Sequence, residues 1–458
     1  MALQVVVMAA GKGTRMKSGR PKVLHRLAGR SLLQHVLDAT AGLNAERTCI
    51  VVGYGAVEVQ AQTGNAPRRV YVHQEPQLGT GHAVQQVVPQ LAPQAGTTLI
   101  LNGDVPLIRT DTARALAAAC AGERLALLTI ELADPGGYGR IVRSPSGDAV
   151  QAIVEHKDAS EAQRAIREVY TGMLAAPTAW LARAVMALKN DNAQHEYYLT
   201  DIVAMAVAEG VPVVATRAAD ETEVLGVNNP LQLAELERRF QRAQAEALME
   251  HSGVRLADPA RIDIRGALTC DSDVEIDVGC IFEGSVTLGE GVRIGAHCVV
   301  RDARIEAGAV IHPFSHIDGA TVGPGALVGP VARLRPGAEL GAEVHIGNFV
   351  EVKNSTRARG AKANHLAYLG DATVGERVNF GAGSITANYD GANKHRSVIG
   401  ADVHVGSNCV LVAPITIGDG ATIGGGSTIA KDAPAGQLTV ARAGQVSIAG
   451  WKRPVKRK

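Results

Sequence analysis

The chain has 458 residues, with 46 lysine and arginine residues against 45 aspartate and glutamate residues and a formal net charge of +1 at pH 7. Its length exceeds one compact domain and predicts two or three. A hydrophobic fraction of 46% excludes global disorder, and the balanced charge gives no reason to expect a nucleic-acid partner. The six cysteines include no CxxC pair, so we expect reduced thiols and not a disulfide framework.

The apolar segment 3–10 has no basic region before it and runs directly into a glycine-rich turn. We therefore interpret it as a first strand and not as a signal peptide. No apolar run approaches the ~18 residues that are needed to span a bilayer. We expect a soluble, cytoplasmic protein without a membrane partner.

Residues 1–228 alternate short apolar runs with helical stretches, such as 31–41 and 80–88. This alternation is typical of an α/β domain with a mostly parallel, Rossmann-like sheet. The predicted strands are Gln4–Met8, Cys49–Val52, Arg69–His73, Thr98–Asn102 and Leu125–Ile130.

The first predicted strand leads into the loop 9–16, AAGKGTRM, with Lys22 shortly after it. The loop matches neither the dinucleotide-binding GxGxxG nor the P-loop GxxxxGK[ST]. Its glycines let backbone N–H groups approach a phosphate, and Arg15 and Lys22 add positive charge. A phosphate site is thus one interpretation, and a plain turn with solvated basic residues is the other.

The apolar strand 98–102 runs into Gly103 and Asp104. Ligand crevices of α/β folds form at the carboxyl ends of parallel strands. Asp104 is therefore a candidate Mg²⁺ ligand, although an aspartate in a simple turn would look the same.

The pattern changes to a single long helix over 229–250. Asn229 can cap this helix, Pro230 suits its first position, and no glycine follows until Gly253. We interpret the segment as a connecting helix between two domains.

After residue 259, aliphatic residues recur every six positions. This period fits neither an α-helix nor an ordinary strand, but it fits a coil with three six-residue sides whose aliphatic side chains point inward. Hexapeptide repeats of this kind build a left-handed parallel β-helix, which we assign to 251–458. The repeat positions are Leu288, Ile294 and Val300, then Val322, Val328, Leu334, Leu340, Ile346 and Val352, then Ile399, Val405, Leu411, Ile417, Ile423 and Ile429.

The phase of the repeat breaks once between its two regular runs, across 354–371. We expect a loop that leaves the β-helix here, and function is a common reason for keeping such a loop. His365 lies in it and has an intrinsic pKa of ~6.5, which suits a general base for an amine. A structural histidine is the competing interpretation.

Short segments of the first domain resemble motifs of the sugar-nucleotide pyrophosphorylases. With the predicted β-helix behind them, the whole chain is similar to the bacterial family of bifunctional N-acetylglucosamine-1-phosphate uridylyltransferase/glucosamine-1-phosphate N-acetyltransferases. The segments are 11–16 (GKGTRM) with 21–22 (PK), 77–82 (QLGTGH), 102–104 (NGD), 137–140 (GYGR), 154–157 (VEHK) and 226–229 (GVNN).

The resemblance implies a site for UTP and the UDP-sugar, with Mg²⁺ on Asp104 and Asn228 and with Arg15 and Lys22 acting on the phosphates. One position departs from the family, because Tyr170 stands where an asparagine is usual, which leaves one sugar contact in doubt. The implied nucleotide and sugar residues are Ala9, Ala10, Gly11, Lys22, Gln74, Gly79, Thr80, Asn102, Gly103, Asp104, Gly139, Glu155, Tyr170 and Asn228.

The resemblance also implies that His365 is the base of the acetyltransferase. Glucosamine-1-phosphate would bind Arg335, Lys353, Tyr368 and Asn379. The implied acetyl-CoA residues are Ala382, Asn388, Tyr389, Ser407, Gly425 and Arg442.

Our hypothesis is a cytoplasmic homotrimer that acetylates glucosamine-1-phosphate with acetyl-CoA and then uridylylates the product with UTP. The product, UDP-N-acetylglucosamine, is a precursor of peptidoglycan and lipopolysaccharide. Two rivals are a single-activity pyrophosphorylase whose β-helix only oligomerises, and a non-catalytic scaffold built on the same two folds. The basic tail after Trp451 is interpreted as solvated or close to coenzyme A, and not as a nucleic-acid arm.

Overall fold

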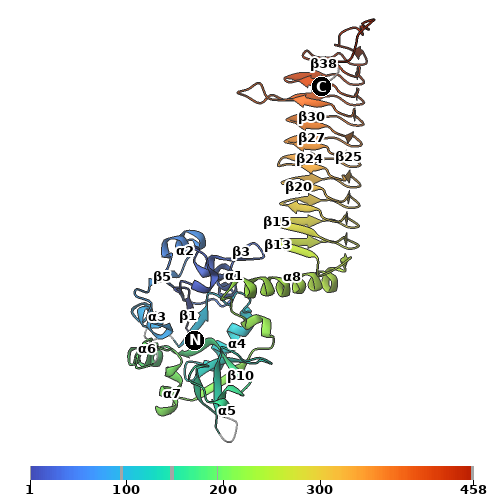
Figure 1. Cartoon of the computed structure of the whole chain (residues 1–458). Coiled ribbons are helices and arrows are strands. Elements are labelled where there is room, and N and C mark those ends of the chain that lie inside the picture. The colour runs from blue at the N-terminus through green and yellow to red at the C-terminus, as the bar shows by residue number, and fades with distance from the viewer. Residues whose placement is uncertain (1, 93–95, 145–148, 193, 455–458) are drawn as a thin grey trace. The chain divides into compact units, whose positions relative to one another are not determined.

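The computed structural model describes residues 2–92, 96–144, 149–192 and 194–454. The chain divides into two compact units, Met1–Arg239 and Phe240–Lys458 (Figure 1). In the part of the chain that the structure describes, no helix has both the length and the apolar character that crossing a membrane requires.

The N-terminal unit is built on one sheet with the strand order β11-β7-β10-β6-β1-β4-β5. Its pairs β1–β4, β1–β6, β4–β5 and β7–β11 are parallel, whereas β10 runs antiparallel to β6 and β7. This confirms the five predicted strands and the mostly parallel sheet. The strands are β1 Leu3–Met8, β4 Arg47–Val52, β5 Arg69–His73, β6 Thr97–Asn102, β7 Leu125–Glu131, β10 Glu168–Pro177 and β11 Val213–Arg217.

Both faces of this sheet are buried, which explains the continuous apolar strands. Val5 and Val7 of β1 belong to one core cluster, Val6 belongs to another, and all three are fully buried. Helices α1 (Leu32–Ala41) and α4 (Thr110–Cys120) contribute to the first cluster. The second receives α3 Thr80–Val87, α6 Thr178–Met186 and α7 Asp201–Ala208.

A hairpin of β8 (Gly139–Arg143) and β9 (Val150–Val154) extends the sheet beside β10. The register of β10 against β7 shifts between Tyr170 and Leu174, which marks a bulge. Gly172 lies in this bulge with φ +84°, and a Cβ there would come within 2.4 Å of the Asn102 amide nitrogen. The bulge therefore brings β10 close to the carboxyl end of β6.

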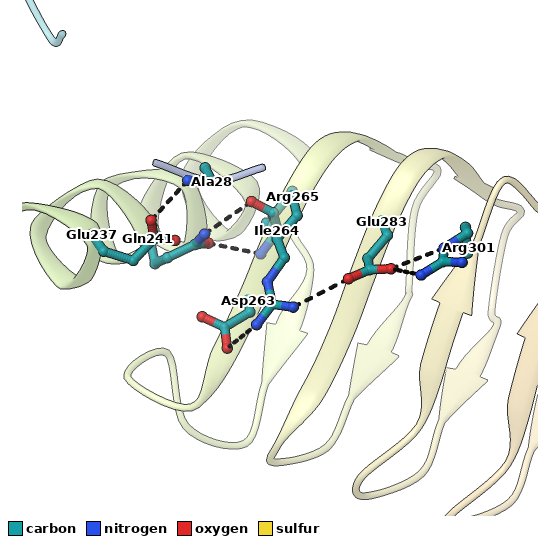
Figure 2. Close-up of polar contacts among 8 residues, drawn as sticks. All are labelled: Ala28, Glu237, Gln241, Asp263, Ile264, Arg265, Glu283 and Arg301. Atoms are coloured by element: carbon teal, nitrogen blue, oxygen red, sulfur yellow. Dashed lines mark hydrogen bonds and ion pairs between the residues drawn. The ribbon is translucent and has the colours of Figure 1, made fainter. Parts of the chain in front are cut away.

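The long helix α8 spans Pro230–Ser252, where the sequence predicts a helix over 229–250. At its start, Asn229 Oδ1 accepts from the backbone N–H of Gln232 at 2.9 Å. Within the N-terminal unit, the Glu237 carboxylate accepts from the Ala28 N–H at 2.7 Å (Figure 2).

Within the second unit, the Gln241 side chain pairs with both backbone groups of Ile264 on the first long strand, β13 (Ile262–Cys270). Its Nε2 donates to the Ile264 carbonyl at 2.9 Å and its Oε1 accepts from the Ile264 N–H at 2.7 Å (Figure 2). The other edge of β13 pairs in parallel with β15 (Cys280–Leu288). The amide thus covers an edge that would otherwise lack hydrogen-bond partners.

The second unit is a parallel β-helix whose short strands stack coil upon coil (Figure 1). Every residue of the three predicted repeat runs is 3% exposed or less, which confirms that the repeat points inward. One side of the stack consists of β12 Arg255–Leu256, β14 Glu275–Ile276, β16 Arg293–Ile294, β19 Val310–Ile311, β22 Leu327–Val328, β25 His345–Asn348, β28 Lys362–His365, β31 Asn379–Phe380, β34 His404–Val405, β37 Thr422–Ile423 and β39 Leu438–Thr439.

The predicted loop over 354–371 is wrong. This segment stays in the stack as β27 (Ser355–Arg357), β28 and β29 (Tyr368–Gly370), and Ile346 pairs with Ala363, 17 residues on, where Val328 pairs with Ile346, 18 residues on. The phase break is therefore one missing corner residue. The true excursion lies between β32 (Ile385–Ala387) and β33 (Ser397–Ile399).

Candidate functional site

A cavity of about 290 Å³ opens at the carboxyl ends of β1 and β6 in the N-terminal unit. It brings together ten of the residues predicted for the nucleotide and metal. Gly103 lies beside it in the chain, and its N–H donates to the Met8 carbonyl at 2.9 Å. The lining residues are Met8, Ala9, Ala10, Gly11, Lys22, Val23, Gln74, Gln77, Gly79, Thr80, Ala83, Asn102, Asp104 and Glu196.

Four polar side chains meet at the rim of this cavity. The Lys22 ammonium forms an ion pair with Asp104 and lies 3.3 Å from Asn228 Oδ1, while Arg15 donates to the same Asn228 oxygen at 3.1 Å. A carboxylate oxygen and an amide oxygen thus point at one position of positive charge. These are oxygen donors of the kind that Mg²⁺ prefers, and Mg²⁺ takes its remaining ligands from water and substrate phosphates.

No group of three or more histidine, cysteine, aspartate or glutamate side chains is placed to hold a metal within the residues that the structure describes. A metal at this rim would thus have few protein ligands, as Mg²⁺ sites on nucleotide phosphates do.

A second cavity of about 230 Å³ shares Met8, Thr80 and Asn102 with the first. Glu155 lies in it, with burial raising the pKa of its carboxyl and Thr200 donating to it at 3.3 Å. The shared walls place a molecule in this cavity next to one in the first. The other lining residues are Gly137, Tyr138, Gly139, Tyr170, Thr171, Gly172, Leu199 and Thr200.

Tyr170 lines the second cavity but is only 7% exposed. Its hydroxyl is buried and has no hydrogen-bond partner among the described residues. Burial, with a smaller contribution from the Glu155 carboxylate, raises the pKa of Tyr170. The tyrosine therefore forms a wall of this cavity while its hydroxyl stays inside the core.

Arg140 is a residue to which sequence reasoning gave no role. Its guanidinium is buried and donates to the carbonyls of Tyr138 and Arg164 and to the ring of His156. It thereby ties the loop 137–139 to the segments behind it. The motif GYGR was the available signal, but only the fold shows that its arginine points inward.

In the β-helix, His365 lies at the end of β28, one coil after Asn348 of β25. The two side chains meet with Nδ1 2.8 Å from Asn348 Oδ1. Because an amide oxygen only accepts, Nδ1–H is the donor, and Nε2 is left with its lone pair. Asn348 was missed in the sequence, where the 17-residue spacing to His365 was the only signal.

The residues predicted for glucosamine-1-phosphate form a cationic group near the same corner of the coil. Arg335 pairs with Glu351 at 2.8 Å, and Glu351 neighbours Tyr368 across the β26–β29 pair, β26 being Glu351–Lys353. Lys353 lies beside Lys394, whose hydrogen bond and charge help to lower the pKa of Lys353. Lys394 was also missed, because it lies in the excursion.

Asn379, which was predicted for the same ligand, starts β31 one coil after Lys362. Its side-chain amide lies 3.3 Å from His404 Nδ1.

Four of the predicted acetyl-CoA residues stack at one corner of successive coils. The Asn408 N–H donates to the Ala382 carbonyl and the Gly426 N–H to the Ser407 carbonyl, each at 2.8 Å. Arg442 donates to the Gly425 carbonyl at 2.6 Å.

Asn388 and Tyr389 lie at the base of the excursion. Asn388 is buried and donates to Asp371, whereas Tyr389 is exposed and donates to the Gly391 carbonyl at 2.6 Å. The Asn388 amide is thus engaged within the β-helix.

Three protein families match the chain. The MobA-like NTP transferase domain matches residues 5–253, the GMPPB C-terminal domain matches 264–356, and the bacterial transferase hexapeptide, as six repeats, matches 396–431.

Curated relatives match along the whole chain. The bifunctional protein GlmU of Methylibium petroleiphilum is 74% identical, with 100% of both chains covered. That of Paracidovorax citrulli is 68% identical with 99% of each covered, and that of Azoarcus sp. is 59% identical with 100% of each covered.

Proposed function

This chain belongs to the GlmU family of bifunctional proteins, and from that premise we propose how its parts share the two reactions. It synthesises UDP-N-acetylglucosamine by N-acetylation of glucosamine-1-phosphate and uridylyl transfer to the product. We assign uridylyl transfer to 1–228, acetyl transfer to 251–458, and a connecting role to the helix 229–250.

The two cavities with shared walls carry the uridylyltransferase proposal. UTP would occupy the larger one, and N-acetylglucosamine-1-phosphate the smaller one beside Glu155 and Gly139. A phosphate oxygen of the sugar attacks the α-phosphorus as the bond to pyrophosphate breaks, so no protein nucleophile is needed. Lys22 and Arg15 hold the phosphates in line and offset their negative charge.

Asp104 and Asn228 would hold Mg²⁺, because their oxygens converge on one cationic position. When bound, Mg²⁺ supplies neutralisation of the phosphate charge. Lys22, which now pairs with Asp104, would then turn its ammonium to the phosphates.

His365 would be the base for acetyl transfer. The amine nitrogen attacks the thioester carbon, His365 Nε2 takes the amine proton, and the coenzyme A thiolate leaves as the C–S bond breaks. The bond from Nδ1–H to Asn348 keeps the basic lone pair on Nε2. Arg335, Lys353, Tyr368 and Asn379 would bind glucosamine-1-phosphate, and Lys394 would add charge toward its phosphate.

Acetyl-CoA would bind along the corner formed by Ala382, Ser407, Gly425 and Arg442, with Tyr389 at its edge. The corner consists of backbone groups of successive coils, tied together at 2.8 Å, so it offers an extended binding track. The Arg442 guanidinium supplies positive charge for the phosphates of coenzyme A.

A homotrimer is supported by an apolar ridge on successive corners of the β-helix, made of Phe314, Val331, Phe349 and Leu366. These side chains are 61%, 40%, 56% and 62% exposed. All four have positive φ, between 49° and 61°, a conformation that is unfavourable for bulky side chains. Covering the ridge with copies of the chain offsets both costs. The six free, buried cysteines suit the cytoplasm.

A coupled assay tests the proposal. The purified chain receives acetyl-CoA, glucosamine-1-phosphate, UTP and Mg²⁺, each omitted in turn, and acetylated sugar phosphate and UDP-sugar are followed by mass. We expect acetylation without UTP and no UDP-N-acetylglucosamine without acetyl-CoA. Uridylylation of supplied N-acetylglucosamine-1-phosphate without any acetylation would instead support the single-activity rival.

A further inference from the structure

Gln74 follows strand β5 and lines the larger cavity, although its side chain is only 3% exposed. Its Nε2 donates to the Gly79 carbonyl at 3.0 Å and faces His82 Nδ1 at 3.3 Å. An amide nitrogen has two N–H groups, so both are used. Its Oε1 accepts no hydrogen bond from the described residues, which leaves this oxygen as the open polar atom of Gln74.

His82 is held from its other side by Gln86, one turn later in α3, whose side-chain amide lies 3.0 Å from His82 Nε2. A neutral imidazole that accepts at Nδ1 carries its proton at Nε2. Gln86 therefore turns its amide oxygen toward His82, since only the oxygen accepts that proton. The resulting chain runs from Gln86 through His82 and Gln74 to Gly79.

This chain fixes which end of the Gln74 amide faces the cavity. If the amide were turned over, its oxygen would face the lone pair of His82 Nδ1 and the carbonyl of Gly79, and both hydrogen bonds would be lost. Such losses cost about 0.5–1.5 kcal/mol each. His82 itself is not among the described residues that line the cavity, so it acts through Gln74.

We propose that His82 is a positioning residue that sets the base preference of the nucleotide site, an inference that rests on the proposed binding of UTP in this cavity. The fixed Oε1 of Gln74 accepts a hydrogen bond from a nucleobase that carries a ring N–H, as uracil does. Cytosine has a ring lone pair at that position, which would face the oxygen lone pairs. A site with such a fixed polar atom rejects the mismatched base because a buried group is left unpaired.

The test measures kcat/KM for UTP and for CTP in the full-length protein with N-acetylglucosamine-1-phosphate and Mg²⁺. His82→Leu removes the acceptor, and His82→Asn is the matched control, because its Oδ1 can take the place of Nδ1. We expect the UTP/CTP ratio to fall about two- to tenfold in H82L and to stay near wild type in H82N. The kcat with UTP and the KM for the sugar phosphate should change by less than about twofold.

An unchanged UTP/CTP ratio in H82L would overturn the proposal, as would an equal loss for both nucleotides in H82L and H82N. Acetyltransferase activity of each variant reports on the integrity of the chain. If H82L does not fold, Gln86→Leu gives a second measurement, since it releases the Nε2 proton and should lower the ratio in the same direction; no change in that ratio would also overturn the proposal. Wild-type protein without activity on UTP would contradict the proposed function instead.

Discussion

The Lys22 ammonium pairs with the Asp104 carboxylate and lies 3.3 Å from Asn228 Oδ1. These residues are far apart in the sequence, and the fold brings them together at the carboxyl edge of the sheet. The same two oxygens can serve a lysine in the free protein and a metal with its nucleotide in the complex. This exchange explains why a carboxylate is required at Asp104 in both states.

Asp104→Ala should abolish uridylyl transfer and leave acetyl transfer near normal, because the variant loses a proposed metal ligand and the partner of Lys22. Both activities are measured on the same preparation. Asp111→Ala is the control, since that aspartate is exposed and pairs only with Arg114 near it on α4. Near-normal UDP-sugar formation by D104A at ordinary Mg²⁺ concentration would remove Asp104 from the metal site.

His365→Ala should lower the acetyltransferase rate by about 10²–10⁴-fold, the usual contribution of a general base. Asn348→Ala should cost less, because it frees the ring to rotate and to move its proton without removing the base. Uridylylation of supplied N-acetylglucosamine-1-phosphate should survive in both variants. His251→Ala, on the exposed end of α8, is the control. A loss below about threefold in H365A would make His365 a structural residue.

Arg357→Leu should stabilise the β-helix. The guanidinium of Arg357 is 2% exposed at an inward position, and none of its three nitrogens has a hydrogen-bond partner in the described part of the chain. Its neighbours in register are Leu340 and Val374. A leucine removes the unpaired polar group, so we expect the free energy of unfolding to rise by about 1–3 kcal/mol.

The pH dependence of this gain has a definite sign. Burial lowers the pKa of Arg357 to about 10, so the folded state disfavours its charged form. The penalty is fully present below that pH and shrinks as pH rises above it. Calorimetry at pH 7 therefore measures the whole effect. Arg359→Leu is the control, because that side chain is 65% exposed and pairs with Glu343; a lower melting temperature for R357L than for wild type would contradict the prediction.

Phe349→Glu should break the trimer. The new charge would lie in the middle of the apolar ridge, where a partner chain would have to bury it. Size-exclusion chromatography with light scattering should show monomers, and the acetyltransferase rate should fall if copies complete that site. Val57→Glu, at an exposed apolar residue of the N-terminal unit, should leave the mass unchanged. A stable F349E trimer would show that the ridge is not the interface.

The inward repeat could be predicted because a six-residue period has few structural solutions, and burial confirms it from Leu288 to Ile429. The loop over 354–371 could not be judged in the same way. A missing corner residue and an excursion both break the phase, and only the pairing of Ile346 with Ala363 separates them. Asn348 was out of reach for a related reason, since neighbours across coils are 17 or 18 residues apart.

The cavity of the N-terminal unit was largely predictable, because most of its walls come from loops that follow strands. Gln74, Asp104 and Glu155 all lie where the motifs placed them. The role of Arg140 was not predictable, because a sequence does not reveal that a charged side chain is buried among carbonyl groups. Tyr170 shows the same limit, as its hydroxyl lies in the core.

A fragment that starts at Pro230 should be more stable than one that starts at Gly253. The shorter fragment lacks Gln241, which pairs with Ile264, and Ala245, which is fully buried in the β-helix core. Two lost hydrogen bonds cost about 1–3 kcal/mol together, and the uncovered edge of β13 invites self-association. Urea titration and light scattering compare the two fragments; equal midpoints would show that the amide pair contributes nothing.

The Gln241 amide also gives the stack a direction. Each coil of a solenoid is stabilised mainly by its two neighbours, so a terminal coil without a cover is the first to open. Because Gln241 holds the first long strand at Ile264, loss of structure on heating should begin at the far terminus and travel back toward α8. The coils that carry the proposed coenzyme A track would be released before those next to the helix, so this chain should lose acetylation early in a gradual, directional melt.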